Sequence, residues 1–148
     1  METVDKLDVG FNLSTVEVLQ FLLNSMPSPG TKYEAFYFNI QVEHKIDTTN
    51  KNIHVLIHTN IYSKEGNDIE NELGKVSVVC IYQIEKFDEI HNIIDGLIQL
   101  PNDLIIAINS ISISTTRGIM YQLFKGTYIH AALLPLIDPK AMQLQPKE

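Results

Sequence analysis

Three runs with the residue spacing of β-strands constrain the fold of this chain more than any other feature. The first, YEAFYFNIQVEHKI, alternates polar residues with the apolar Phe36, Phe38, Ile40, Val42 and Ile46. The second, IHVLIHTNIY, has Ile53, Val55, Ile57 and Ile61 on one face and His54, Leu56, His58 and Asn60 on the other. The turn-forming sequence DTTNKN lies between them. Together the two runs predict a long hairpin with one buried and one hydrated face.

The third run, KVSVVCIYQI over residues 75–84, is apolar on both faces. One face carries Val76, Val78, Cys80 and Tyr82, and the other carries Val79 and Ile81. A strand that is buried on both faces needs cover from a helix or from a second subunit. The preceding stretch SKEGNDIENELG, residues 63–74, is polar and acidic, and we expect it to be an exposed loop.

Residues 108–130, INSISISTTRGIMYQLFKGTYIH, fit two patterns at once. The alternation of Ile and Ser is typical of a half-buried strand. The apolar residues also form two helical stripes, which contain Leu104, Ile108, Ile111, Thr115, Ile119 and Leu123 in one and Ile106, Ile113, Met120 and Phe124 in the other. Asn102 or Asp103 is suited to cap such a helix after Pro101, and Gly126 to end it. The residues alone do not decide between strand and helix.

A second ambiguous segment is FNLSTVEVLQFLL, residues 11–23. Ser14 and Glu17 have the spacing of a capping box, which favours a helix. The Val- and Phe-rich composition favours a strand. The break NSMPSPGTK, with two prolines and a glycine, ends the segment in either case.

Composition narrows the class of protein. The chain has 148 residues, which we expect to form a single domain, and a formal net charge of -7, which disfavours binding to nucleic acid or to an anionic membrane. No apolar run reaches the ~18 residues of a membrane span, and METVDKLDVG lacks the apolar region of a signal peptide. The single cysteine, Cys80, suits a reducing cytosol and predicts a small buried side chain.

The chemistry-bearing residues do not form a convincing enzyme site. The sequence has neither a nucleophile motif nor a phosphate-binding glycine loop. His54 and His58 lie ~13 Å apart if they belong to one strand, which is too far to share a metal ion. His44 could face one of them across the hairpin, so a small enzyme or metal protein that uses His44, His54 and His58 stays a weaker alternative. The acidic residues Asp68, Glu70 and Glu72 are expected to be a solvated surface or, less often, a docking site for a basic partner.

Surplus apolar sequence is the remaining feature. The third strand and the segment 104–124 carry more apolar surface than one small sheet needs, and the non-periodic TYIHAALLPLI follows. Such surplus predicts an oligomer interface or a binding groove. The alternative is an ordinary, well-filled α+β core.

The order of these motifs resembles that of the SecB family of bacterial export chaperones and their relatives, over residues 33–139. The strands ending in KVSVVCIYQI are followed by LP, by RG within the long segment, and by KGTYIHAALLPLI, which is similar to the family's Arg-Gly-Thr-Phe turn and proline-containing segment. The resemblance implies an α+β fold with a four-stranded antiparallel sheet and one long helix from Leu104 to about Lys125. Residues 11–23 would be the first strand, and a second C-terminal helix would be short or absent.

The resemblance also implies a function, namely ATP-independent holding of unfolded or exported proteins in apolar grooves, without a cofactor or catalysis, in the cytoplasm. The client-binding positions would be Leu56, Val79, Ile81, Tyr121, Phe124, Tyr128, Ile129, Leu133 and Leu134. A dimer of dimers would use the second helical stripe as an oligomer interface, with Ile106, Ile113, Arg117 and Met120. A translocation motor or a toxin is a possible partner, and the alternative function is a dedicated chaperone for one partner, as in toxin–antitoxin systems.

Overall fold

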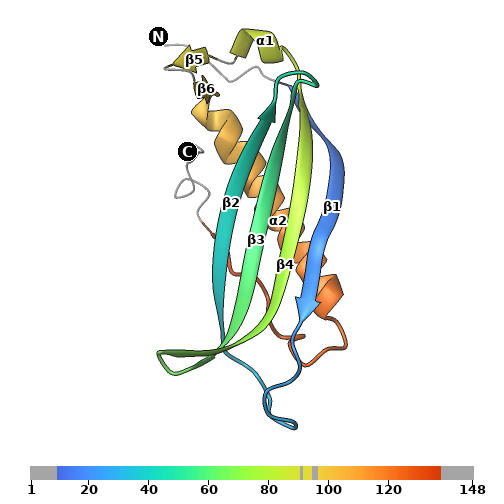
Figure 1. Ribbon diagram of the computed structural model, residues 1–148, viewed down its shortest axis with the longest axis vertical. Coiled ribbons are helices and arrows are strands. Elements are labelled where there is room, and N and C mark those ends of the chain that lie inside the picture. The colour runs from blue at the N-terminus through green and yellow to red at the C-terminus, as the bar shows by residue number, and fades with distance from the viewer. Residues whose placement is uncertain (1–9, 91, 95–96, 138–148) are drawn as a thin grey trace, which may run out of the picture.

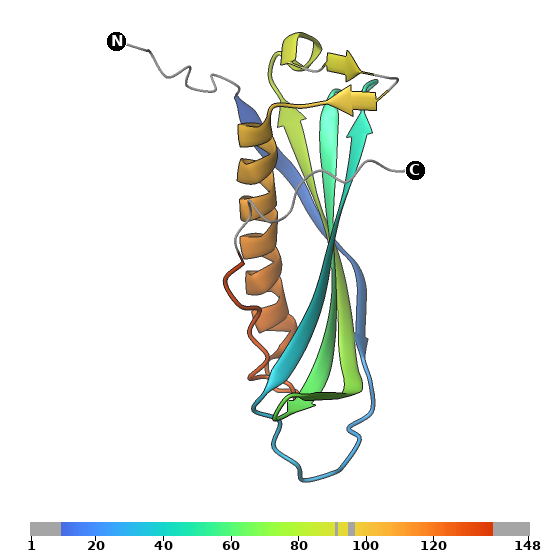
Figure 2. The ribbon, with the colours of Figure 1, turned by 90° about the vertical axis from the view of Figure 1, so that its left-hand side faces the viewer.

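The computed structural model describes residues 10–90, 92–94 and 97–137 of the chain. Its main elements are four long strands and one long helix: β1 (Phe11–Leu23), β2 (Phe36–Asp47), β3 (Asn52–Glu65), β4 (Asp68–Ile84) and α2 (Asn102–Phe124). Between β4 and α2 lie the short α1 (Phe87–Ile90), β5 (Asn92–Ile94) and β6 (Leu97–Gln99). The four long strands form one antiparallel sheet in the order β1-β4-β3-β2, and α2 lies across one face of it (Figures 1 and 2). The predicted α+β fold is confirmed.

The core lies between this sheet and α2. The alternation in β2, β3 and β4 places the expected apolar residues toward the helix, and Ile53, Val55, Ile57, Val78 and Cys80 are fully buried there. Cys80 is thus the small buried side chain that the sequence predicts. None of the described helices lies over the opposite face of the sheet (Figure 2).

The long segment is a helix. The side chains that α2 buries repeat about every four residues, as Leu104, Ile108, Ser112, Thr116, Met120 and Phe124, with Ile105, Asn109 and Ile113 beside them. Helix propensity disfavours Ile and Ser by less than ~0.7 kcal/mol each, so burial of this stripe against the sheet outweighs the local preference for a strand. Pro101 precedes the helix and Gly126, at φ 80°, follows it, as the sequence predicts.

The ambiguous first segment is the strand β1, and two β-bulges explain its irregular pattern. The pairing with β4 shifts between Leu13 and Thr15 and again between Val18 and Gln20. Each bulge inserts one residue and restores the apolar side chains to the helix-facing side of the sheet. The Ser14 hydroxyl lies at the first bulge and donates a hydrogen bond to the Ile81 carbonyl at 3.0 Å. The capping-box spacing therefore marks a bulged strand.

The expectation of an exposed loop over residues 63–74 is wrong. β3 continues to Glu65 and β4 begins at Asp68, so Gly66 and Asn67 alone form the turn of a tight hairpin. Gly66 has φ 60°, which glycine adopts without steric cost. The acidic side chains suggested a loop, but a hairpin that extends beyond the core can carry polar residues on both faces.

A segment without helix or strand, residues 125–137, follows α2, and we call it the strap. It leaves the end of α2 and turns back alongside the helix (Figure 2). The expected short or missing second helix would lie in residues 138–148, outside the described residues. Residues 1–9 of METVDKLDVG also lie outside them, so the expected absence of a signal peptide stays a prediction.

Candidate functional site

Exposed apolar side chains gather on β1. Five of its residues are among the most exposed large hydrophobic side chains: Val16 at 39%, Val18 at 44%, Leu19 at 51%, Phe21 at 41% and Leu22 at 44%. β1 is an edge strand, because it pairs with β4 on one side only. An edge strand with free backbone groups and apolar side chains is a template for pairing with another chain. β1 is therefore the first candidate for an interaction surface.

These β1 residues are not among the site residues that the sequence predicts. Apolar residues on both sides of the strand are present in FNLSTVEVLQFLL, but the two bulges make their alternation unrecognisable without the pairing partner. Only Phe21 has a ring contact with the helix, since its ring centroid lies 6.1 Å from that of Phe124. The signal in the sequence that indicates this surface is an apolar segment without the regular alternation of a strand.

A second exposed apolar area lies at the end of α2 and on the strap. Tyr121 is 57% exposed, Leu133 is 56% exposed and Leu136 is 91% exposed. Tyr121 and Leu133 are two of the predicted client-binding residues, and in this structure both can meet another polypeptide.

Three other predicted client-binding residues, Phe124, Ile129 and Leu134, are at most 1% exposed. They belong to the hydrophobic core of the protomer, and Ile129 lies against Gly74, since its Cδ1 atom would be 3.5 Å from a side chain at that position. Their assignment to an open client surface is wrong for this protomer. Phe124 is buried by α2 against the sheet, where its ring lies 6.1 Å from that of Phe21, and Ile129 and Leu134 are buried because the strap folds back onto the protomer.

Tyr128, also predicted to bind clients, is half-buried in the contact between the strap and the sheet. Its hydroxyl donates to the carbonyls of Asn24 at 2.7 Å and Leu73 at 3.3 Å. Its ring lies 5.7 Å from that of Tyr33 in the β1–β2 connection. Burial raises the pKa of this phenol, and Tyr33 adds to the effect. Tyr128 thus fastens the strap to two carbonyls that are far away in sequence.

The remaining predicted client positions lie on the outer face of the sheet. Leu56 and Val79 are direct neighbours on β3 and β4, and Ile81 follows two residues along β4. Leu56 is 8% exposed and Val79 is 5% exposed, although neither belongs to the core cluster beneath α2. In the protomer alone Leu56 and Val79 therefore offer little surface, and Ile81 is half-buried.

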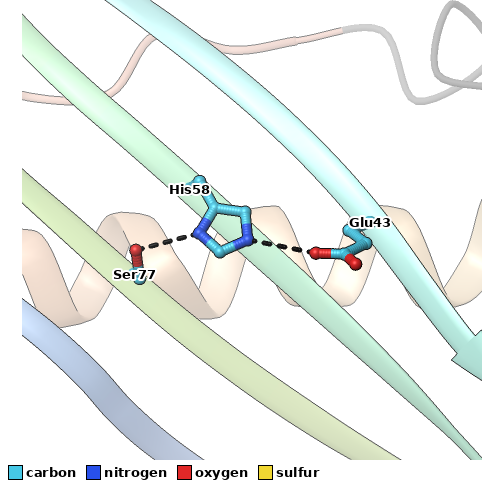
Figure 3. A network of polar contacts seen from close by, with 3 residues as sticks. All are labelled: Glu43, His58 and Ser77. Atoms are coloured by element: carbon cyan, nitrogen blue, oxygen red, sulfur yellow. Dashed lines mark hydrogen bonds and ion pairs between the residues drawn. The ribbon is translucent and has the colours of Figure 1, made fainter.

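Glu43, His58 and Ser77 form a polar network across the same outer face (Figure 3). The His58 Nδ1 atom lies 2.9 Å from the Ser77 Oγ atom, and its Nε2 atom lies 3.5 Å from a Glu43 carboxylate oxygen. Serine, histidine and a carboxylate in this order also occur in hydrolase triads. Here Ser77 lies in the central strand β4, paired with both neighbouring strands, so nearby backbone N–H groups serve the sheet rather than an oxyanion. The geometry is that of a cross-strand contact.

Polar side chains also join α2 to the inner face of the sheet. The His44 Nε2 atom lies 2.6 Å from the Asn109 Oδ1 atom, and the Tyr82 hydroxyl lies 2.8 Å from the Ser112 Oγ atom and 3.2 Å from the Ile108 carbonyl oxygen. Burial lowers the pKa of His44, so the neutral imidazole with Nε2–H donating to Asn109 is favoured. Burial raises the pKa values of Tyr82 and Cys80. These contacts fix the position of α2 along the sheet.

Two of the four predicted oligomer-interface residues, Ile113 and Met120, are buried within the protomer, whereas Ile106 and Arg117 stay predictions. Ile113 is 3% exposed and Met120 is fully buried, so both face the protomer's own sheet, while Ile106 is half-buried. Arg117 donates from Nε to the Leu134 carbonyl at 2.7 Å and from Nη2 to the Pro135 carbonyl at 2.9 Å. The two predicted helical stripes do not match the buried face of α2. The residues that face the sheet come from both stripes, because the buried face winds around the helix.

The histidines do not come together as metal ligands. His44 points toward α2, whereas His54 and His58 lie on the outer face. No cluster of three or more His, Cys, Asp or Glu residues suited to a metal ion occurs within the described ranges.

Comparisons with known proteins show a similarity in structure but not in sequence. No family model and no curated protein sequence matches the chain. Among solved structures, the chain is similar to the SecB-like chaperone Rv1957 of Mycobacterium tuberculosis, whose structure was determined in complex with a ChAD peptide from the antitoxin HigA1 (Rv1956). The TM-score is 0.55 at 10% sequence identity, and the alignment covers 86% of each chain.

The described helices include none with the length and hydrophobicity needed to span a bilayer. The sheet order, the long helix on one face and the match over most of both chains agree with one another. This chain therefore has the fold of the SecB-like chaperones.

Proposed function

We propose that this protein is an ATP-independent chaperone that holds unfolded polypeptides through apolar contacts. The observation that carries the proposal is the amount of apolar surface that the protomer leaves uncovered on β1, on α2 and on the strap. Binding by burial of apolar side chains needs neither a nucleotide nor a metal ion. The SecB-like fold supports the same role, because the similar solved structure is that of a chaperone with a bound peptide.

The proposed assembly is a dimer of dimers. Pairing of two β1 edges would join the two sheets and cover Val18, Leu19 and their neighbours. The outward side of α2, with Ile111 at 37% exposure and Gly118 open to solvent, would pack against the helix of the other dimer. Small residues allow two helices to approach closely, so this outward side replaces Ile113 and Met120 as the proposed interface.

Clients would bind on the remaining apolar surface. Tyr121 and Leu133 are its exposed predicted members, and Leu56, Val79 and Ile81 on the outer face stay predicted members that nothing yet tests. An unfolded protein of any sequence with apolar segments would satisfy such a surface. We propose a cytoplasmic location from the single, buried cysteine, and we propose no enzymatic activity and no cofactor. A role in export, with a translocation motor as partner, belongs to the same proposal.

A dedicated chaperone for one partner is the second candidate. The specific observation in its favour is that the similar solved chaperone holds a peptide from an antitoxin. Such a protein would bind one partner with selectivity on the same scaffold.

The test is a holding assay in which a chemically unfolded, aggregation-prone protein is diluted into stoichiometric amounts of this protein and light scattering is followed. We expect suppression of scattering that is equal with and without ATP. The double variant Tyr121→Asp/Leu133→Asp should suppress light scattering at least several-fold less than the wild type does. The matched control Thr48→Asp/Gln83→Asp adds the same charge at exposed positions and should behave like the wild type. Undiminished scattering with the folded wild type would reject the general holdase in favour of the single-partner protein.

A further inference from the structure

The strap buries apolar side chains of its own on the rest of the protomer. Its segment Ile129–Leu134 has the sequence IHAALL and lies against the end of the sheet without forming a helix or strand. Ile129, Ala132 and Leu134 are at most 2% exposed, whereas His130, Ala131 and Leu133 point to solvent. A short apolar segment that buries part of its side chains on a sheet is what an unfolded protein presents to a holding surface.

Hydrogen bonds from two side chains fasten the strap to distant parts of the protomer. Arg117 binds the two carbonyls of Leu134 and Pro135 at one end, and the Tyr128 hydroxyl binds those of Asn24 and Leu73 at the other. The hydrogen bonds within the strap, such as His130 N–H to the Thr127 carbonyl and Ala132 N–H to the Ile129 carbonyl, can persist after it leaves the sheet. The strap can therefore detach without breaking a strand pairing or the helix.

We infer that the strap is an intramolecular stand-in for the client, and that its release from Arg117 and Tyr128 opens the part of the holding surface that it covers. This inference rests on the proposed holding function and deepens it. Release would expose Ile129 and Leu134, which are buried in the closed protomer. It would also uncover the sheet around Gly74, against which Ile129 packs. Client affinity would then depend on the fraction of molecules in which the strap is open.

Two variants loosen the strap at opposite ends. Tyr128→Phe keeps the aromatic ring and removes the hydroxyl donor, and Arg117→Gln removes the guanidinium that binds two carbonyls. Loss of one such hydrogen bond should raise the open fraction about fivefold. Arg117→Lys retains the charge and one donor, so it should lie between Arg117→Gln and the wild type. Tyr37→Phe and Lys45→Gln, on the edge strand β2, are the matched controls.

Three measurements on the full chain test the inference. Hydrogen exchange of the amides of residues 127–137 should become about fivefold faster in Tyr128→Phe and Arg117→Gln, with exchange in β3 and β4 unchanged. Binding of an apolar fluorescent dye should rise in the same variants. The protein concentration that halves aggregation of an unfolded protein should fall by about the same factor. The controls should match the wild type in all three.

Two results would overturn the inference. In the first, the wild type holds clients and the strap is released in the variants, but the variants hold clients no better than the wild type. The strap would then be part of the binding surface rather than its cover. If strap exchange does not respond to either variant, Arg117 and Tyr128 do not fasten it. A wild type and variants that all fail to hold clients, despite released straps and increased dye binding, would instead reject the proposed function on which the inference rests.

Discussion

The neighbouring strands β1 and β4 carry similar apolar side chains in very different environments. Val18 of β1 lies directly opposite Val78 of β4, and Phe21 lies opposite Val76. Val76 and Val78 are fully buried, whereas Val18 is 44% exposed and Phe21 is 41% exposed. The four side chains share the helix-facing side of the sheet. The difference lies in position, because β4 has a strand on each side and β1 has one only.

This comparison separates residues that build the fold from residues that are free to bind. Burial of a β4 valine stabilises the protomer, while the same residue type on β1 gains little until another chain covers it. Retaining five large apolar side chains on an open edge is a hazard for aggregation unless the edge has a partner. The function that we propose for this protein depends on the apolar side chains that the protomer leaves exposed.

The largest expected effect comes from shortening the two opposed valines. Val78→Ala should lower the free energy of unfolding by about 2 kcal/mol, because it removes two methyl groups and leaves a cavity. Val18→Ala should cost less than ~1 kcal/mol in dilute protein, since its side chain is already in contact with water. Urea denaturation of both variants measures the comparison.

The stability cost of Val18→Ala should also be measured at several protein concentrations. If two β1 edges pair in solution, the cost of Val18→Ala should grow as the concentration rises, because stability then includes association. Equal costs for the two variants at every concentration would show that β1 is covered within the protomer, and the contrast between the strands would be lost.

Removing a hydrogen bond at the centre of the sheet should cost more stability than removing one at the edge strand β1. Ser112→Ala removes the buried partner of the Tyr82 hydroxyl and should cost about 1 kcal/mol. Ser14→Ala removes the exposed contact at the first β1 bulge and should cost less, since water can replace it. Thermal unfolding of both variants checks the order, and a larger loss for Ser14→Ala would mean that the bulge, not the central contact, organises the sheet.

A smaller effect with the opposite sign is expected in β3. The Thr59 side chain is fully buried, and its hydroxyl has no hydrogen-bond partner among the residues that the structure describes. Thr59→Val keeps the shape and removes the unpaired polar atom, so stability should rise by up to ~1 kcal/mol. A decrease in the denaturation midpoint would reveal a partner for this hydroxyl.

The smallest effect at neutral pH concerns His44 beneath α2. Its pKa is lowered by burial from the usual 6.5, so the unfolded chain binds a proton more readily than the folded one. The stabilising contribution is complete above about pH 6.5 and is lost as the pH falls toward the lower, folded-state pKa. His44→Gln should flatten the decline of stability between pH 7 and pH 5. An unchanged pH profile would show that other groups cause the decline.

The sequence predicted the regular part of the fold well. Residues 36–46, 53–61 and 75–84 have the period of strands and form β2, β3 and the buried part of β4. The helix was ambiguous in local pattern, and burial against the sheet decides its structure. The resemblance of the motifs to the SecB family pointed to the same arrangement, which the similarity in structure confirms at the level of the fold.

The candidate site was harder to predict, for physical reasons. β1 hides its pattern because each bulge shifts the alternation by one residue. The stripe of α2 that faces the sheet takes Ile113 and Met120, which a division into two straight stripes assigns elsewhere. The burial of Ile129 and Leu134 depends on the strap turning back along the helix, and no local spacing encodes that turn.

Equilibrium binding of a labelled, permanently unfolded protein, measured by fluorescence anisotropy with and without ATP, tests the central claim most directly. We expect saturable binding of the unfolded form, no binding of its native counterpart and the same affinity in the presence of ATP. Absence of binding by the folded protein, or equal binding of native and unfolded forms, would contradict a holding function based on apolar burial.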